Sequence, residues 1–417
     1  MKPSQAYVRK YLTFAATGFL GLACFNFIVD PQHLFRAVKI DQFNREKYQV
    51  SEPVLRTVKS LDLEQGNYDT LILGTSRTHN GIDPSHPVFD GSSAYNAALE
   101  GSHIFEIRDV LRFAIEHQSL TTVVLGLDMG SFSVGWTHGE DFSKSRFSDR
   151  NVYLTYLDRL ISRQTTIDSL KTIAKNVLDY EQDIIKTDRG FKQRKPRSID
   201  ARQLFRKELN YSLADISEID SSKPAFSKET LNALRDIIIA CRENDIELHL
   251  FISPVHARQL EKMQSLGLFA DFEQWKREVV AIVDEDRSAH PEKNIISVLD
   301  FSGYNSFTTE AVPPENSSEQ MRWYLEASHY KKDLGDIVLD VVLNDTARSK
   351  EIPEDFGIAI DRDNIETHLA QIRSDRERYR QNYPDEVEEV AQAVRNALGQ
   401  PFDETVRVPS SPTPSIR

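Results

Sequence analysis

The sequence has little cysteine and no excess of basic charge. Its 417 residues include two cysteines, Cys24 in an apolar segment and Cys241 on a predicted helix, so we expect no disulfide bond between them and no cysteine-based metal site. The formal net charge of -13 argues against nucleic-acid binding, because a phosphate backbone requires a basic surface. The turn Gly74-Thr-Ser-Arg77 also lacks the lysine and glycine spacing of a P-loop. We expect no metal ion and no cofactor.

One long apolar run is present, from Tyr11 to Val29, and it is close to the roughly 20 residues that span a bilayer. Basic residues precede it and Asp30 follows it, which by the positive-inside rule leaves the amino terminus in the cytoplasm and the rest outside. We therefore expect a membrane anchor. A cleaved signal peptide and a lipoprotein signal ending at Cys24 are the alternatives.

A strand and a turn of small residues surround Ser76. Thr70 to Leu73 has the composition of a strand buried on both faces of a parallel sheet. Gly74 allows a sharp turn, which places the Ser76 hydroxyl at the carboxyl end of the strand, where open α/β sheets bind ligands. An ordinary capping serine in a strand-to-loop turn is the other interpretation.

A second motif, Glu326-Ala-Ser-His329, precedes an amphipathic run from Lys332 to Leu343. An acid placed just before a histidine can orient and polarise the imidazole so that it deprotonates a serine. The two motifs together predict Ser76 as nucleophile, His329 as general base and acid, and Glu326 as the orienting carboxylate.

The order of these motifs resembles the SGNH (GDSL-type) hydrolase superfamily. The likeness is to its membrane-anchored periplasmic bacterial members, which are related to polysaccharide O-acetyltransferases. The matching segments are Asp69 to Pro84, Tyr95 to Ser102, Val123 to Phe132, His249 to His256, Leu299 to Gly303 and Tyr324 to Tyr330. The sequence departs from the family twice: Asp128 stands without the usual Gly-x-Asn-Asp block, and Glu326 replaces an aspartate.

The resemblance implies further site residues. An oxyanion hole would use the backbone N–H of Ser76 or Thr75 and a donor from Asn96 or Gly101. Three residues near strand ends would support the site from a second layer: Asp128, His256 and Asp300. The alternatives are that Asn96 caps a helix, that His256 is a surface-loop histidine and that Asp300 caps a turn.

Strands and helices alternate over the matched region, which predicts a doubly wound, three-layer α/β sandwich with about five parallel strands, the flavodoxin-like SGNH hydrolase fold. An N-terminal transmembrane helix and a C-terminal helical extension flank it. We expect an anchor (1–30), a connector (31–67), the SGNH-like domain (68–348) with an insertion (133–226), the helical extension (349–400) and a disordered tail (401–417).

The predicted function is that of a serine esterase or O-acyltransferase on the periplasmic side of the inner membrane. Its expected substrate is an acylated envelope carbohydrate, with acetyl as the expected acyl group, or a related ester. Other polysaccharide-modification proteins of the envelope are candidate partners, and nucleic acid is not. The alternative is a non-catalytic envelope scaffold or polysaccharide-binding protein, because a fold alone does not fix a function.

Overall fold

A computed structural model describes residues 3–48, 54–135, 137–179, 184–194, 200–214, 225–292, 296–343 and 352–399. Within these ranges the main sheet has six strands in the order β2-β1-β3-β6-β7-β8. They are β1 (Thr70–Leu73), β2 (Ala94–Asn96), β3 (Thr122–Leu127), β6 (Glu247–Ile252), β7 (Val298–Asp300) and β8 (Ile358–Ile360). All neighbours pair in parallel except β7 and β8, which are antiparallel. The prediction of a mostly parallel α/β sheet is confirmed.

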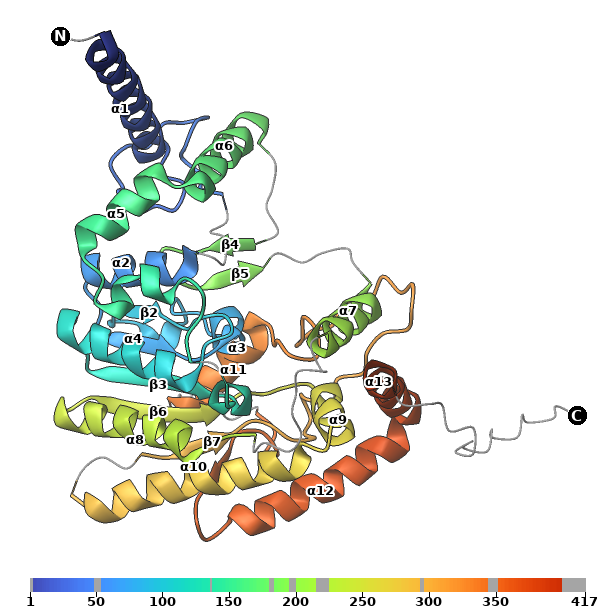
Figure 1. Ribbon diagram of the computed structural model, residues 1–417. Helices are drawn as coiled ribbons and strands as arrows, with labels where there is room; N and C mark the ends of the chain where they lie inside the picture. The colour runs from blue at the N-terminus through green and yellow to red at the C-terminus, as the bar shows by residue number, and fades with distance from the viewer. Residues whose placement is uncertain are drawn as a thin grey trace, which may run out of the picture.

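Helices cover both faces of this sheet (Figure 1). Leu71 and Leu73 enter a core formed with α4 (Ile104–His117), α8 (Lys228–Glu243) and α10 (Phe269–Ala289). Ile72 faces the other way and belongs to a second core, which contains α11 (Lys332–Val342). Successive side chains of a strand point to opposite faces, so a fully apolar strand serves two cores.

The helices form where the apolar periodicity predicts them. Ser227 begins α8 with a capping box, in which it and Thr230 exchange side-chain to backbone hydrogen bonds. The predicted apolar face of this helix is buried, from Leu231 through Ile238 to Cys241. Helix α8 thus leads into strand β6, as predicted, and β6 pairs in parallel with β3.

Helix α1 (Pro3–Val29) extends away from the rest of the molecule (Figure 1). It is long and apolar enough to cross a membrane, judged by length and composition alone. Its C-terminal part packs against α5 (Val152–Ile161) and α6 (Arg163–Leu178), which belong to the predicted insertion. The two cysteines are free: Cys24 is exposed on α1 and Cys241 is buried.

Two segments outside the predicted domain contribute to its core. Helix α2 (Leu55–Gln65), in the expected connector, buries Leu55 and Leu63 in the first core. The C-terminal extension supplies β8 and the helices α12 (Ile365–Asn382) and α13 (Pro384–Ala397). Leu369 of α12 lies in the same core, so the extension is integral to the domain rather than an exposed appendage. The tail, 401–417, lies outside the described residues.

Candidate active site

Ser76 is the first residue of the short helix α3 (Ser76–Gly81), directly after β1. Gly74 makes the turn with a φ of +147°, and a Cβ there would lie 2.3 Å from Thr78 Oγ1 and 3.0 Å from the Gly126 carbonyl oxygen. Thr75 caps the helix, because its side chain accepts a hydrogen bond from the Arg77 N–H. Glycine at position 74 is therefore required by the close approach of α3 to the end of β1.

The far end of α3 is seated by a second close contact. A Cβ on Gly81 would lie 1.9 Å from the Tyr330 ring, and a Cβ on Gly335 would lie 1.8 Å from the Gly81 carbonyl oxygen. Glycine at positions 81 and 335 thus lets α3 lie directly on α11 and on the residue that follows His329. The helix carrying Ser76 and the loop carrying His329 are packed as one unit.

A closed loop holds the acid and the histidine. Tyr324 and Tyr330 form an antiparallel bridge, and the Leu325 N–H donates to the His329 carbonyl at 2.9 Å. The Lys331 N–H donates to the Trp323 carbonyl at 2.7 Å just outside it. These bonds close the loop on itself, so the side chains of two nearby residues on it can meet.

The structure brings the three predicted catalytic side chains into one hydrogen-bonded series. His329 Nε2 lies 2.8 Å from Ser76 Oγ, and His329 Nδ1 is hydrogen-bonded to Glu326 Oε1. The other oxygen, Glu326 Oε2, accepts the Ser328 N–H at 2.8 Å. Both side chains are mostly buried, with 21% of His329 and 15% of Glu326 exposed.

The charge of Glu326 is stabilised in place. Burial raises the pKa of a carboxyl, but the neighbouring His329 charge and the bonds from His329 and Ser328 outweigh it and hold the pKa of Glu326 below its usual value. An ionised carboxylate at Nδ1 fixes the tautomer in which Nε2 is free to accept the serine proton. The extra methylene of glutamate is accommodated, since both of its oxygens find donors within the loop.

Asp128, at the end of β3, joins α3 to the same loop. Its carboxylate accepts Thr75 Oγ1 at 2.5 Å and Arg77 Nη1 at 2.6 Å, and Arg77 Nε donates to the Ser328 carbonyl at 3.1 Å. Burial lowers the pKa of Arg77, but the Asp128 carboxylate more than offsets this and raises it, so the guanidinium stays charged. Arg77 received no role from the sequence, although it is the neighbour of Ser76.

The two predicted oxyanion-hole donors in the β2 region are placed differently. All N–H groups of Asn96 are engaged: its amide donates to the carbonyls of Thr78 and Ile82 at 3.0 and 2.7 Å, and its backbone donates to Arg189 at 2.9 Å. Asn96 therefore braces the end of α3 and has no donor left for an oxyanion, which corrects that prediction. Gly101 lies in an exposed turn with a φ of +60°, and its role as a donor stays a prediction.

His256 and Asp300 stabilise neighbouring elements of the fold rather than bonding to the reacting groups. His256 is buried, caps α9 (Ala257–Ser265) through Nδ1, and contacts the Glu310 carbonyl through Nε2 at 2.7 Å. Its backbone N–H donates to the Ala327 carbonyl at 3.1 Å, so it also supports the loop that carries Glu326 and His329. Asp300 binds Lys276 and His368 at 2.5 and 2.8 Å, and its pKa is lowered because these charges outweigh its burial.

The insertion contributes residues that sequence reasoning did not assign. Strands β4 (Ile184–Lys186) and β5 (Lys192–Arg194) form a hairpin beside α3, where Arg194 Nε donates to Asn80 Oδ1 at 2.8 Å. Asn80 in turn donates to the Ser76 carbonyl at 2.6 Å. This link from Arg194 to Ser76 could not be predicted from the sequence, because the hairpin is more than a hundred residues away from Ser76 along the chain.

Glu208 and Lys262 form a mostly buried charge pair. Glu208 on α7 (Ala201–Leu213) is 3.6 Å from Lys262 Nζ, which donates to Ser212 Oγ at 2.8 Å. Burial raises the pKa of Glu208, and the charge of Lys262, which lowers it, only partly offsets this effect. The charge of Glu326 raises the pKa of Glu208 further.

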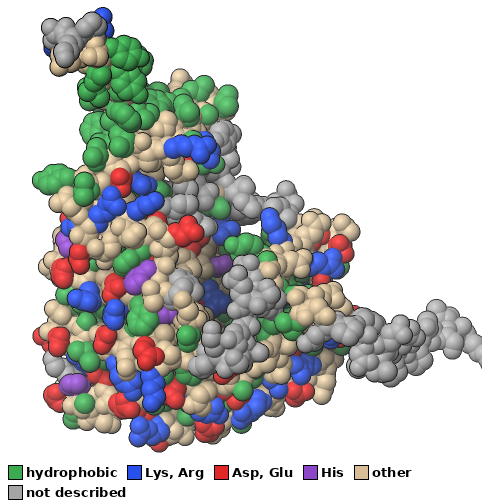
Figure 2. Space-filling model, in the orientation of Figure 1, with side chains coloured by type: hydrophobic (Ala, Val, Ile, Leu, Met, Phe, Trp, Pro, Cys, Tyr) green, Lys and Arg blue, Asp and Glu red, His purple; other side chains and the backbone are tan. Residues whose placement is uncertain are grey.

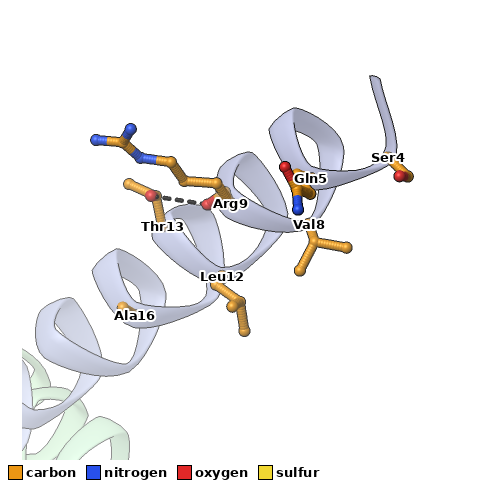
Figure 3. Close-up of a pocket in the computed structure, with 7 residues that line it drawn as sticks. All are labelled: Ser4, Gln5, Val8, Arg9, Leu12, Thr13 and Ala16. Carbon is orange, nitrogen blue, oxygen red and sulfur yellow. Dashed lines mark hydrogen bonds between the residues drawn. The ribbon is translucent and has the colours of Figure 1, made fainter. Parts of the chain in front are cut away.

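Comparison with known proteins adds no relative: no protein-family model matches the chain, and no curated protein matches it. The hollow beside α1 does not provide another site. Ser4, Gln5, Val8, Arg9, Leu12, Thr13 and Ala16 line it, and all come from one helix, on which Thr13 Oγ1 donates to the Arg9 carbonyl at 2.9 Å (Figure 3). A binding site needs walls from several directions, so the Ser76 region remains the candidate.

Proposed function

We propose that this chain is an SGNH-type serine esterase or O-acyltransferase, held at the inner membrane by α1 with its sheet domain in the periplasm. The observation that carries the proposal is the hydrogen-bonded series from Ser76 through His329 to Glu326. A nucleophile, a base within reach and a third group that orients the base are the general requirements of acyl transfer by serine.

The geometry supports a two-step reaction. His329 Nε2 takes the Ser76 proton while Oγ attacks the acyl carbonyl carbon, and the same imidazole then protonates the departing alcohol oxygen. The acyl group remains on Ser76 until water or a sugar hydroxyl, deprotonated by His329, attacks it; the bond from the acyl carbon to Ser76 Oγ then breaks, and His329 returns the proton to Oγ. Water gives hydrolysis, and the sugar hydroxyl gives transfer. The backbone N–H of Ser76, at the start of α3, is the donor we assign to the oxyanion.

The fold and the proposed membrane location together favour an acylated envelope carbohydrate as the substrate class. The five parallel strands follow the doubly wound order, and Ser76 stands at the carboxyl end of β1, beside the point where that order reverses between β1 and β3. The α1 segment and the resemblance to envelope enzymes together favour an acylated envelope carbohydrate as substrate. Partner proteins of envelope polysaccharide modification would supply or receive the acyl group.

One observation favours a second candidate, a non-catalytic envelope scaffold or polysaccharide-binding protein. All the N–H groups of Asn96 donate to carbonyls within the fold. In addition, Asp128 occupies the position at which many SGNH enzymes supply an asparagine. Fewer oxyanion donors would leave the transition state less stabilised, at about 3–4 kcal/mol per missing donor.

The deciding experiment uses the full chain in detergent with a tagged fluorophosphonate and with p-nitrophenyl acetate. We expect labelling at Ser76, found by peptide mass spectrometry, and loss of labelling and ester cleavage in Ser76→Ala and His329→Ala. Ser85→Ala, which removes an exposed serine in the same region, is the control and should behave as the parent. If Ser76→Ala keeps the parent activity, or the parent reacts with neither probe, the scaffold function replaces the catalytic one.

A further inference from the structure

Helices α5 and α6 have their polarity reversed relative to helices of a water-exposed domain. Their buried side chains are polar or charged: Thr155 and Arg159 on α5, and Thr165, Asp168, Ser169, Thr172 and Lys175 on α6. Their exposed side chains include large apolar ones: Tyr153 (78% exposed), Leu154 (52%), Leu157 (49%), Ile161 (37%), Leu170 (58%), Val177 (64%) and Leu178 (71%). Surface helices in water normally turn the apolar stripe inward.

Part of this polar side faces the end of α1, whereas Thr172 and Lys175 further along α6 bond to Tyr48 and Glu46. Asn26, fully buried on α1, donates to the Leu160 carbonyl at 2.8 Å and to Thr166 Oγ1 at 3.1 Å. The Asn26 side-chain oxygen, Oδ1, accepts a hydrogen bond from Ser169 Oγ at 2.9 Å. The corner between α5 and α6 is therefore fastened to the last turns of α1 by side-chain hydrogen bonds.

The exposed apolar residues of α5 and α6 continue a surface that begins on α1. Phe27 and Ile28, near the C-terminal end of α1, are 38% and 41% exposed, and Phe19 and Leu20 above them are 61% and 65% exposed. Figure 2 shows hydrophobic side chains gathered over α1 and onto the region where it joins the body, whereas further away charged and hydrophobic side chains are mixed. One apolar surface thus runs from the candidate span onto the insertion.

We infer that α5 and α6 lie in the lipid–water interface, with their exposed apolar side chains inserted at the boundary between headgroups and acyl chains. The inference rests on the proposed membrane anchoring by α1, and it adds a second contact with the same bilayer. An amphipathic helix that lies in the plane of the membrane buries its apolar face to about 5–10 Å in this way. Arg163 and Lys171, the charged residues of α6 that are exposed, are both cationic and suit anionic headgroups.

Lipid explains this surface better than a second protein does. A protein partner would have to cover α5 and α6 while lipid surrounds the adjoining turns of α1, on one continuous apolar surface. The interfacial contact also has a consequence for the site, because it gives the sheet domain two attachments instead of one. Ser76 would then be held at a fixed height and orientation above the membrane.

The test measures collision of spin labels with oxygen, which partitions into lipid, and with a neutral nickel chelate, which stays in water. The full chain carries Cys24→Ala and is reconstituted in nanodiscs of zwitterionic and anionic phospholipid; Cys241 is buried and need not be replaced. Labels are placed by Leu154→Cys, Leu157→Cys and Val177→Cys. Phe19→Cys on α1 is the lipid reference, and Ile239→Cys on α8, 50% exposed, is the matched apolar reference for water.

We expect the ratio of oxygen to nickel collisions at positions 154, 157 and 177 to exceed that at 239 severalfold and to approach that at 19. A water-like ratio at these positions with a lipid-like ratio at 19 overturns the interfacial inference and leaves the anchor intact. A water-like ratio at 19 removes the anchor and the inference together. Low collision rates with both reagents at 154 and 157 mean that protein covers the face, which also overturns the inference.

Discussion

Arg77 Nη1 lies 2.6 Å from Asp128 Oδ1, and this pair connects the strand end beside Ser76 to the loop of His329. The same guanidinium reaches the Ser328 carbonyl through Nε at 3.1 Å and Ser328 Oγ through Nη2 at 3.3 Å. Ser76 and His329 come from segments far apart in the sequence, so their separation depends on what holds the loop against α3. Arg77 is the side chain that spans both.

Replacing this connection should lower turnover more than binding. We expect Arg77→Met to reduce kcat for a Ser76-dependent ester about 10²-fold with little change in KM, because a displacement of about 1 Å between reacting groups can cost that much. Asp128→Asn should act in the same direction but less, since an amide can still bond one partner. Steady-state kinetics and the rate of fluorophosphonate labelling measure both.

The control for that pair is Arg108→Met on α4, which removes a partly exposed arginine paired with Asp109 and Asp236. Exposed pairs contribute about 0–1 kcal/mol, so kcat should stay at the parent value. Parent-like kcat in Arg77→Met would show that the loop keeps its place without the arginine.

Changes at Glu326 test the orienting carboxylate. Glu326→Gln keeps the shape but removes the charge that favours the imidazolium, and we expect kcat to fall by as much as about 10⁴-fold. Glu326→Asp withdraws the carboxylate by one bond of about 1.5 Å. It can then reach His329 or the Ser328 N–H but not both, so its kcat should lie between those of the parent and the amide variant.

Glu326→Gln also distinguishes a Ser–His–Glu triad from a Ser–His dyad. Because the pKa of Glu326 is lowered, its carboxylate is ionised at neutral pH. The stabilisation that it gives to the charged imidazole is lost only as the pH falls through the lowered pKa. The deficit of Glu326→Gln should therefore persist at neutral pH. If that variant turns over like the parent at pH 7 while Ser76→Ala is inactive, a Ser–His dyad carries the reaction.

The fold was predictable where the signal is local. Apolar strands such as Thr70–Leu73 and helices with a regular apolar face carry their own signal in a few adjacent residues. Strand β8 was missed because Ile358–Ile360 is three residues long and exists only through antiparallel pairing with β7. For the same reason the C-terminal helices were placed outside the domain, since their partners lie on distant parts of the chain.

The site was predictable to the same extent. Ser76 and His329 stand in short motifs at a strand end and before a helix, so their meeting followed from the expected topology. The partners of the Asn96 donors could not be assigned from sequence, because the carbonyls of Thr78 and Ile82 come within reach of them only once β2 lies beside α3. Arg77 was overlooked because a charged residue after a nucleophile has no partner until β3 supplies Asp128.

Gly81→Ala tests the seat of α3 on α11. Its Cβ would lie 1.9 Å from the Tyr330 ring, which is buried and cannot move aside, so α3 must shift and carry Ser76 with it. We expect a destabilisation of about 1–3 kcal/mol, typical of overpacking, and loss of most ester cleavage. The melting temperature and kcat of the purified chain measure the two effects.

Gly130→Ala is the matched control, because a Cβ at Gly130 meets nothing within 4 Å and its φ is not in the left-handed region. Its stability and kcat should match the parent within about 0.5 kcal/mol, as for surface substitutions in general. Equal behaviour of the two alanine variants would mean that the contact between α3, Tyr330 and α11 is looser than the packing indicates.

His256 should make the protein sensitive to mild acid. Burial lowers the pKa of His256 from 6.5 to about 3, against the weaker effect of the bond to the Glu310 carbonyl. Between these values the unfolded chain binds a proton that the folded chain does not, so the free energy of unfolding falls as the pH drops below about 6.5. From pH 7 to pH 5 this single group should remove about 2 kcal/mol of stability.

His256→Asn isolates that contribution. The asparagine oxygen can still accept the Arg258 N–H at the start of α9, as His256 Nδ1 does, but the side chain does not titrate. The variant loses the bond to Glu310 and should be less stable than the parent at pH 7, yet its further loss on going to pH 5 should be smaller by about 2 kcal/mol. Denaturant unfolding of the full chain in detergent at both pH values gives the two losses. If they are equal, His256 either takes up its proton in the folded state or stays neutral in the unfolded one, and the buried cap does not set the acid limit of this fold.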